Sequence, residues 1–360
     1  MTRRHLLSLL TVSAKLLRAA DDDPHPKFVS SSRRILTAPE LLDAPDEWIE
    51  RSLEWVEYVL ENFPPSIDEN PVRRAALIRL DDVLHIKTAP EKPLVQKYYR
   101  MRLSRALDEI EQTTVSNGMR VWKLYNHGFL IRTPSVSFTY DIVPGVARIP
   151  GFNAGNDLLA RIAAQSDATF ISHLHGDHAN QQVARQFLAL GKPVIAPDGL
   201  WAENLELAHA LTYPKRATNA VQKIPVKHGR QTLTITAYPG HQGESILNNI
   251  NCVTTPEGLT VIQTGDQSLT DVPGSDFDWI AQIGRDHHVN LLLPNCWANS
   301  LHRIVRGVNP DLIITGHENE MGHTVDHRED YTQTYERMYG LRYPFIVMTW
   351  GEGYRYSKPA

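Results

Sequence analysis

The segment ISHLHGDHAN, residues 171–180, gathers side chains that bind metal ions. Three histidines and one aspartate fall within six positions directly after an apolar run, and these are His173, His175, Asp177 and His178. His173 and His175 are two residues apart, so on a strand leaving a sheet both imidazoles would point to one side and could bind one ion. Gly176 lets the chain turn sharply, and we therefore expect the second pair to face a neighbouring ion. Imidazole and carboxylate ligands favour zinc, with iron or manganese as alternatives.

Further ligands must come from elsewhere in the chain, because a catalytic zinc has three protein ligands and one water. Three later apolar runs, each typical of a β-strand, end beside a glycine in a residue that can bind metal: His241 in YPGHQGES, Asp266 in QTGDQS and His317 in ITGHENE. Loops at one set of strand ends build the site in an α/β sheet. Together, five histidines and two aspartates predict a centre for two ions.

These motifs resemble those of the metallo-β-lactamase fold superfamily. The pattern HxHxDH matches residues 173–178, PGHQGES resembles the superfamily's third-ligand turn, and TGDQS resembles its turn with a bridging aspartate. YNHGFLIRT and YDIVPG are similar to its opening strands, which place an aspartate, here Asp141, behind the site. The resemblance covers residues 115–355 and implies a four-layer αβ/βα sandwich, in which two sheets are flanked by helices.

The resemblance also implies a role for each ligand. Two divalent ions, expected to be zinc with manganese or iron as alternatives, would share Asp266 as a bridging ligand. The first ion would have three further ligands, which are His173, His175 and His241. The second ion would have another three, which are Asp177, His178 and His317. A hydroxide between the ions would be the nucleophile, because a bound metal lowers the pKa of water from about 15.7 to about 7.

Two residues are candidates for catalytic proton transfer. Asp177 lies close enough to the expected hydroxide to serve first as base and then as acid. His323, six residues after His317, could contact the substrate, donate a proton to the leaving group, or replace His317 as the ligand. We assign the ligand to His317 because it directly ends the apolar run LIIT. Four more residues are candidates for the pocket, and spacing alone does not decide their roles: Asn126, His127, Asn295 and Trp297.

A centre of this kind predicts a metal-dependent hydrolase acting on a small molecule. The bond would be an ester, lactone, lactam or phosphodiester, because the ligand set does not choose among them. One alternative is a di-iron enzyme of the same fold with redox or oxygen chemistry, since Asp266 would bridge two irons equally well. The other alternative is a metal-binding protein without catalysis.

The elements that position these residues follow from hydrophobic periodicity. Residues 113–360 alternate runs of period two with helical segments, which predicts an α/β domain. Residues 23–112 predict a helical extension, because apolar residues recur at helical spacing in PDEWIERSLEWVEYVLENF, NPVRRAALIRLDDVLHI and KPLVQKYYRMRLSRALDEIEQ. We expect Asn70 to cap the second of these helices. The extension would pack on the main domain, and a wall of the pocket or a homodimer surface is the functional alternative.

Composition limits the partners and the location. The chain has 360 residues, a net charge of −4 and a pI of about 6.5, and it has no block of like charges, so no nucleic-acid partner is expected. Its two cysteines, Cys252 and Cys296, predict buried thiols, with a single disulfide bridge as the alternative. Residues 1–22 resemble a twin-arginine export signal. We expect a periplasmic or secreted location, with a cytoplasmic one as the alternative, and no segment approaches the roughly 20 apolar residues of a membrane span.

Overall fold

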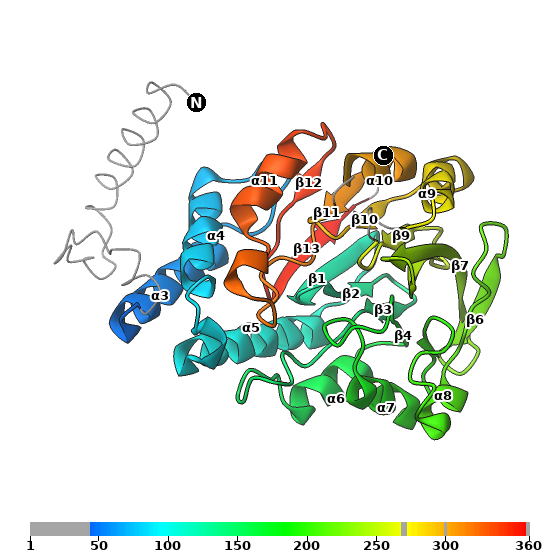
Figure 1. Cartoon of the computed structure of the whole chain (residues 1–360), viewed down its shortest axis with the longest axis horizontal. Coiled ribbons are helices and arrows are strands. Elements are labelled where there is room, and N and C mark those ends of the chain that lie inside the picture. The colour runs from blue at the N-terminus through cyan, green and yellow to red at the C-terminus, as the bar shows by residue number, and fades with distance from the viewer. Residues whose placement is uncertain (1–43, 268–271, 299–300, 358–360) are drawn as a thin grey trace. The chain divides into compact units, whose positions relative to one another are not determined.

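The computed structural model describes residues 44–267, 272–298 and 301–357, which are coloured in Figure 1. The expected export signal, residues 1–22, lies outside these residues, so it stays a prediction. Within the described residues, no helix is long and apolar enough to cross a membrane. The two cysteines are free and buried, as their small number predicted.

Within the described residues, three α-helices precede the first strand, as the periodicity of the N-terminal third predicted. They are α3 (Asp46–Asn62), α4 (Pro71–Leu84) and α5 (Pro93–Gln112), with a short 3-10 turn, η2 (Ala89–Glu91), before α5. Asn70 caps α4 as expected, because its side chain accepts a 2.8 Å hydrogen bond from the backbone N–H of Val72. That these helices form a unit ending at residue 112 stays a prediction.

Two sheets follow in the described chain. The first has the spatial order β13 (Glu352–Tyr356), β1 (Met119–Tyr125), β2 (Gly128–Arg132), β3 (Ser137–Tyr140), β4 (Ala168–Phe170) and β5 (Val194–Ile195). The second has the order β12 (Phe345–Ile346), β11 (Leu312–Ile314), β10 (Leu291–Leu293), β9 (Thr260–Gln263), β8 (Ile246–Thr254), β7 (Gln231–Gln242) and β6 (Gln222–Val226). Strands β3 to β5 and β9 to β12 run parallel, and their neighbours along each sheet are antiparallel.

Alternating side chains show how the sheets are buried. On β10, Leu291 and Leu293 enter the core between the two sheets, whereas Leu292 enters a second core on the opposite face. On β1, Val121 faces the core between the sheets and Trp122 faces the helices. Both faces of each sheet are therefore covered, which is the burial pattern of parallel strands between helices.

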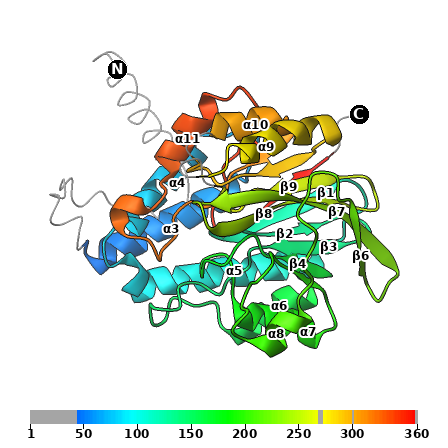
Figure 2. The ribbon, with the colours of Figure 1, turned by 45° about the vertical axis from the view of Figure 1, so that its right-hand side comes forward.

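Helices complete the outer layers. The first sheet is covered by the three N-terminal helices together with α6 (Asn156–Ala164), α7 (Gln181–Ala189) and α8 (Leu205–Ala210). The second sheet is covered by α9 (Ser275–Asp286), α10 (Leu301–Val308) and α11 (Tyr331–Tyr339). Figure 2 shows the succession of helix, sheet, sheet and helix. The predicted αβ/βα sandwich is thereby confirmed.

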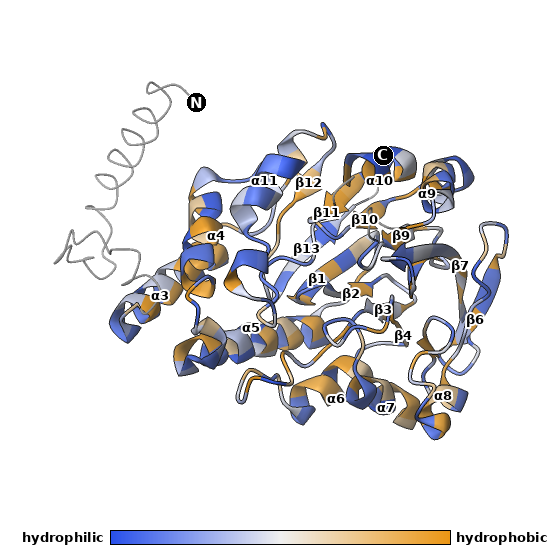
Figure 3. Cartoon of the chain, in the orientation of Figure 1, coloured by the Kyte–Doolittle hydropathy of each residue, from blue (hydrophilic) through white to orange (hydrophobic). Residues whose placement is uncertain are grey.

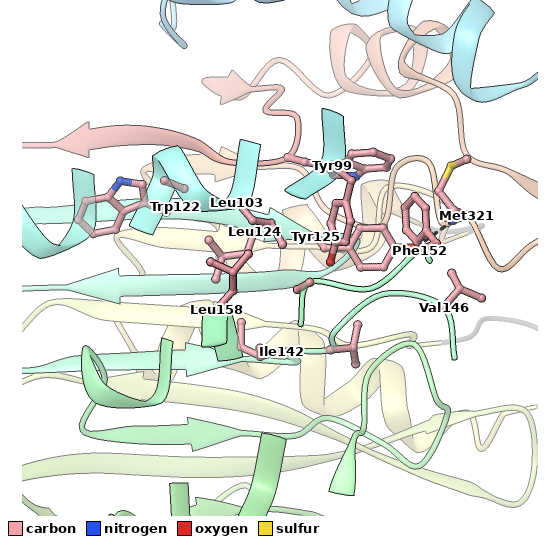
Figure 4. Packing of buried hydrophobic residues seen from close by; sticks show 14 of the residues in the cluster. Tyr99, Leu103, Trp122, Leu124, Tyr125, Ile142, Val146, Phe152, Leu158 and Met321 are labelled. Carbon is pink, nitrogen blue, oxygen red and sulfur yellow. Dashed lines mark hydrogen bonds between the residues drawn. The ribbon is translucent and has the colours of Figure 1, made fainter. Parts of the chain in front are cut away.

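The first sheet and the N-terminal helices share one hydrophobic core. Its centre is aromatic: Tyr99 of α5 stacks on Phe152 with ring centroids 4.7 Å apart and meets Tyr125 and Trp350 edge-on. Met321, from a loop beyond β11, packs into the same cluster (Figure 4). The covering helices are amphipathic, with hydrophobic and hydrophilic residues on different sides (Figure 3). The N-terminal helices are thus continuous with the core that supports the site.

Candidate metal centre

Strand ends of both sheets bring six of the seven predicted ligands to one place. The segment with His173 and His175 follows β4 of the first sheet. In the second sheet, Asp266 and His317 each stand three residues beyond the end of a strand, β9 and β11, while His241 lies inside β7 near its end. Short buried strands hold the backbone rigidly up to the point where these loops begin, which is how α/β sheets position a site.

The ligand atoms form two adjoining groups. Within each group the imidazole nitrogens and carboxylate oxygens all lie within 4.8 Å of one another. The first group contains His173, His175 and Asp266. The second contains Asp177, His178, Asp266 and His317. Asp266 belongs to both, so one carboxylate stands between two places where an ion could bind.

Distances around Asp266 define the centre. Its Oδ1 lies 3.3 Å from Nε2 of His178, and its Oδ2 lies 3.3 Å from Nε2 of His317 and 3.8 Å from Nε2 of His173. Asp177 Oδ2 lies 3.2 Å from Nε2 of His178 and 3.3 Å from Nε2 of His317. Nevertheless the Nε2 atoms of all three histidines are buried without a hydrogen-bond partner. Because buried polar atoms are nearly always paired, three such nitrogens around shared carboxylates fit metal ligation.

The other ring nitrogen of two of these histidines is held by a hydrogen bond, and that of His317 faces a carboxylate without a hydrogen bond. Nδ1 of His173 lies 2.9 Å from Ser172 Oγ, and Nδ1 of His178 lies 2.9 Å from Asp141 Oδ2. Nδ1 of His317 faces Glu329 Oε1 at 3.4 Å. Metal-binding histidines are oriented in this way, with one nitrogen held by an outer partner and the other aimed at the ion. The residues present therefore fit a divalent metal.

Asp141 supports the centre from behind, as its place after the opening strands predicted. Its carboxylate accepts hydrogen bonds from the backbone N–H and the hydroxyl of Ser172, both at 2.7 Å, and from Gln263 Nε2 at 2.5 Å. Its backbone adopts φ 45°, a left-handed conformation that a non-glycine residue rarely adopts. Although Asp141, His127 and His178 also form a close group, Oδ2 of Asp141 is used in orienting His178 and its Oδ1 accepts from the backbone N–H of Ser172.

His127 is buried beside the centre. Its Nε2 lies 3.2 Å from the backbone oxygen of Leu293, and its ring meets those of His178 and His317 with centroids 5.8 and 6.1 Å apart. Burial and the neighbouring His178 hold the pKa of His127 well below its ordinary value. His127 is absent from the lining of the cavity at the centre, so it packs behind the ligands.

Charges within the centre are complementary. Burial alone would raise the carboxyl pKa of Asp177 and Asp266, but His178 and His317 outweigh it and hold both pKa values well below the ordinary range. Conversely, burial alone would lower the pKa of His178, yet Asp266 and Asp177 raise it well above the ordinary value. The two carboxylates are therefore stable as anions, the form that binds a metal, whereas His178 would release its added proton to act as a ligand.

A cavity of about 310 Å³ opens at the centre. Asn295 and Trp297 line it as expected, together with Gln242. Asn295 Nδ2 donates to Asp266 Oδ1 at 2.7 Å, and Gln242 Nε2 donates to Asp266 Oδ2 at 3.2 Å. Asn126 does not line this cavity; its side chain donates to the backbone oxygen of Asp177 at 3.1 Å. A larger cavity of about 500 Å³ elsewhere on the molecule contains no predicted ligand.

His241 and His323 lie apart from the two groups. The side chain of His241 is 16% exposed, and its Nδ1 lies 3.1 Å from Asp276, which leaves Nε2 free. His323 lines the cavity, and its Nδ1 lies 3.5 Å from Glu329 Oε2. Burial would lower the pKa of His323, but Glu329 raises it. His241 as a ligand and His323 as a catalytic residue stay predictions.

Glu329 and Asp276 are the residues that sequence reasoning missed. Glu329 faces both His317 and His323, and Asp276 faces His241. Neither ends an apolar strand, because Glu329 follows the 3-10 turn η3 (Val325–His327) and Asp276 lies in the first turn of α9. The ligands were predicted because they follow apolar strands in the sequence, and carboxylates in helical turns do not have this pattern.

No family model matches the chain, and no curated protein matches its sequence. Solved structures of similar fold exist. Igni18, a metallo hydrolase from the archaeon Ignicoccus hospitalis, is 14% identical and covers 68% of this chain and 100% of its own, with a TM-score of 0.49. A possible metal-dependent hydrolase from Veillonella parvula is 15% identical and covers 67% of this chain and 100% of its own, with a TM-score of 0.49. CmlA, a diiron β-hydroxylase from Streptomyces venezuelae, is 12% identical and covers 67% of this chain and 55% of its own, with a TM-score of 0.47.

Metal-dependent hydrolases are among the solved structures similar to this chain, and one of these structures is described as a putative member of the metallo-β-lactamase superfamily. At these identities the similarity concerns the fold alone. The capacity to bind metal is evident from the chain's own histidine and aspartate groups.

Proposed function

We propose that the chain is a metal-dependent hydrolase whose centre holds two divalent ions with Asp266 as their shared ligand. The observation that supports this most directly is that Asp266 belongs to both groups of ligand atoms. A single-ion site would need only one group, whereas a carboxylate common to two groups suits a pair of ions. We assign zinc as the metal, because imidazole and carboxylate ligands favour it.

The ligands of each proposed ion follow from these groups. His173 and His175 would hold the first ion, with His241 completing its set through the free Nε2. Asp177, His178 and His317 would hold the second. Divalent ions at this place would supply Lewis acidity, which activates a water molecule and polarises the oxygen of the bond to be broken.

Asp177 is the proposed base. Its side chain is 18% exposed and lines the cavity, so one face remains open to a water molecule beside the ligands. Asn126 donates to its backbone oxygen and lies 3.4 Å from Oδ2, which fixes the direction of the carboxylate. From this position Asp177 would orient the attacking water and take its proton.

His323 is the proposed contact for the leaving group. Its side chain is 38% exposed and lines the cavity. Because Nδ1 faces Glu329, Nε2 is the nitrogen left for a substrate. From there His323 would donate a hydrogen bond or a proton to the departing atom.

The proposed substrate is a small molecule with an ester, lactone, lactam or phosphodiester bond. The cavity volume of about 310 Å³ falls at the small end of ligand pockets, which span about 300–1,000 Å³. The net charge of −4 gives no electrostatic attraction toward nucleic acid.

The experiment that tests this proposal measures metal content and hydrolysis on one sample of the full chain. The panel contains a p-nitrophenyl ester, bis-p-nitrophenyl phosphate, a lactone and nitrocefin. We expect two zinc equivalents and hydrolysis that chelation abolishes and zinc restores. The exposed His302 provides the matched control, since His302→Ala should keep both properties. Bound iron with colour that changes on reduction would favour the redox alternative, and metal without hydrolysis would favour a binding protein.

A further inference from the structure

One loop carries several of the proposed site residues. Residues 315–330 follow β11 and hold His317, His323 and Glu329, all of which line the cavity. Its backbone is strained at two places, with φ 74° at His317 and φ 54° at Asn319. Such conformations cost free energy and persist only when surrounding contacts hold them. Something outside the loop must therefore fix its course.

The C-terminal end of α4 makes these contacts. Asp81 Oδ1 accepts a 2.9 Å hydrogen bond from Asn319 Nδ2, and Asp81 Oδ2 accepts a 2.8 Å hydrogen bond from the backbone N–H of Tyr331. The first partner is a strained residue of the loop, and the second is the first residue of α11, directly after the loop. One buried carboxylate thus holds the loop near its start and just beyond its end. α11 also packs against α4 (Figure 1).

Arg328 connects the same two parts from the side of the loop. Its guanidinium donates to the backbone oxygens of Leu84 at 2.6 Å and Ile86 at 3.2 Å, at the end of α4. Its Nε donates to the backbone oxygen of His323 at 3.2 Å. His85 adds a contact from α4, because its Nε2 lies 3.0 Å from the backbone oxygen of Arg328.

We propose that α4 is a positioning element of the metal centre, with Asp81 as the residue that clamps the loop carrying His317, His323 and Glu329. Asp81 touches neither substrate nor ligand atoms and acts through Asn319 and Tyr331. The proposal gives the helical N-terminal region a direct role in the site, beyond packing on the sheets. The expected effect of Asp81 on metal binding rests on the proposed function, in which His317 is a metal ligand.

The burial of Asp81 supports this reading. Its relative exposure is 7%, and a carboxyl removed from water is costly unless it is hydrogen-bonded. Burial raises the pKa of Asp81 well above its ordinary value, and the hydrogen bond from Asn319 lowers it in part. A residue needed only to pack α4 would be apolar at this place, whereas the hydrogen bonds from Asn319 and from Tyr331 account for a carboxylate.

Three variants of the full chain separate positioning from general stability. Asp81→Ala removes both hydrogen bonds. Asp81→Asn is the conservative rescue, because Asn319 can turn its amide and offer Oδ1, which lacks a partner, to the new NH₂ group. Val56→Ala removes two methyl groups from a fully buried residue of α3 and serves as the control for lost stability.

The first measurement is hydrogen–deuterium exchange in protein stripped by a chelator. We expect faster exchange across residues 315–331 in Asp81→Ala, and rates near wild type there in Asp81→Asn and Val56→Ala. Equal exchange of this segment in Asp81→Ala and Val56→Ala would overturn the proposal. Because no metal is present, this result stands apart from the fate of the proposed function.

The second measurement is a titration with Co²⁺, followed by the visible absorption of the bound ion. Loss of an outer support weakens metal binding by about 10- to 100-fold, and we expect this for Asp81→Ala, with recovery in Asp81→Asn. Unchanged affinity and an unchanged spectrum in Asp81→Ala would contradict a role in the centre. If the wild-type protein itself binds no Co²⁺, the proposed function fails, while the exchange experiment still decides whether Asp81 clamps the loop.

Discussion

At the scale of single residues, Asp266 has the least replaceable place in the centre. It is the one residue common to both groups of ligand atoms, and Asn295 and Gln242 hold its two oxygens from the side of the cavity. A histidine could not take over this place, because it offers a single nitrogen toward the centre, whereas a carboxylate offers two oxygens.

We predict that Asp266→Ala loses both metal equivalents, whereas His175→Ala loses mainly one. His175 belongs only to the first group, so the second group stays complete without it. Hydrolysis should fall at least about 100-fold in both variants, the scale on which one preorganised electrostatic group contributes. Metal analysis after dialysis checks this, with His302→Ala as the control. Equal stoichiometry in the two variants would count against Asp266 as the shared ligand.

Asp141→Asn tests the support behind the ligands. Asp141 Oδ2 lies within hydrogen-bond distance of Ser172, His178 and Gln263, and an amide would turn one of its acceptor oxygens into a donor. We expect metal affinity to fall by about 10- to 100-fold, because His178 would lose its orientation. Calorimetric titration with zinc measures this, and Asp157→Asn at an exposed place on α6 is the matched control. Unchanged affinity would remove Asp141 from the centre.

At the scale of elements, the loops after the strands depend on close backbone approach at particular glycines. Gly265, between β9 and Asp266, has φ +50°, and a Cβ there would lie 2.2 Å from Asn248 Oδ1 and 2.5 Å from Ser172 Cβ. At Gly176 a Cβ would meet nothing within 4 Å, and the residue does not have a positive φ. The chain turns at Gly176 as expected, but neither a left-handed backbone nor a close approach requires glycine there.

We predict opposite results for alanine at these two positions. Gly265→Ala should lower the free energy of unfolding by about 1–3 kcal/mol, as forced overpacking does, and should weaken metal binding by displacing Asp266. Gly176→Ala should have the same free energy of unfolding and the same zinc affinity as the wild type. Thermal unfolding and zinc titration of both variants check this. A destabilised Gly176→Ala protein would show that the ligand loop has less room than the structure indicates.

Sequence patterns predicted β4, β9 and β11, which lead to ligands, because these strands are short and mostly apolar. The same patterns missed β8, whose interior contains three buried asparagines, Asn248, Asn249 and Asn251. They also missed β13, which begins with Glu352. Its carboxylate is buried because Arg73 of α4 donates two 2.6 Å hydrogen bonds to it. Such polar groups are buried only because they have partners far away in the sequence. The hydrophobic periodicity of a short segment cannot predict those partners.

At the scale of the whole molecule, α4 connects two regions that the sequence treats separately. Arg73 holds β13 at one edge of the first sheet, and Asp81 holds the loop after β11 of the second sheet. The sequence predicted a helical extension, with pocket wall or homodimer surface as its functional alternatives. The contacts of α4 instead place it behind the loop that lines the cavity. The homodimer stays a prediction, which light scattering of the purified chain checks.

Removal of metal tests the centre at this same scale, because the proposed ligands join the two sheets. His173 and His175 follow β4 of the first sheet, whereas Asp266 and His317 follow strands of the second. A ligand that binds only the folded chain adds about 2.7 kcal/mol to its stability when its free concentration is 100 times Kd. We therefore predict that chelation lowers the unfolding temperature of the wild type and that zinc restores it. Asp266→Ala should unfold at one temperature in chelator and in zinc, because it lacks the shared ligand. If the wild-type protein also had one unfolding temperature in chelator and in zinc, the prediction that a metal ion joins the two sheets would be wrong.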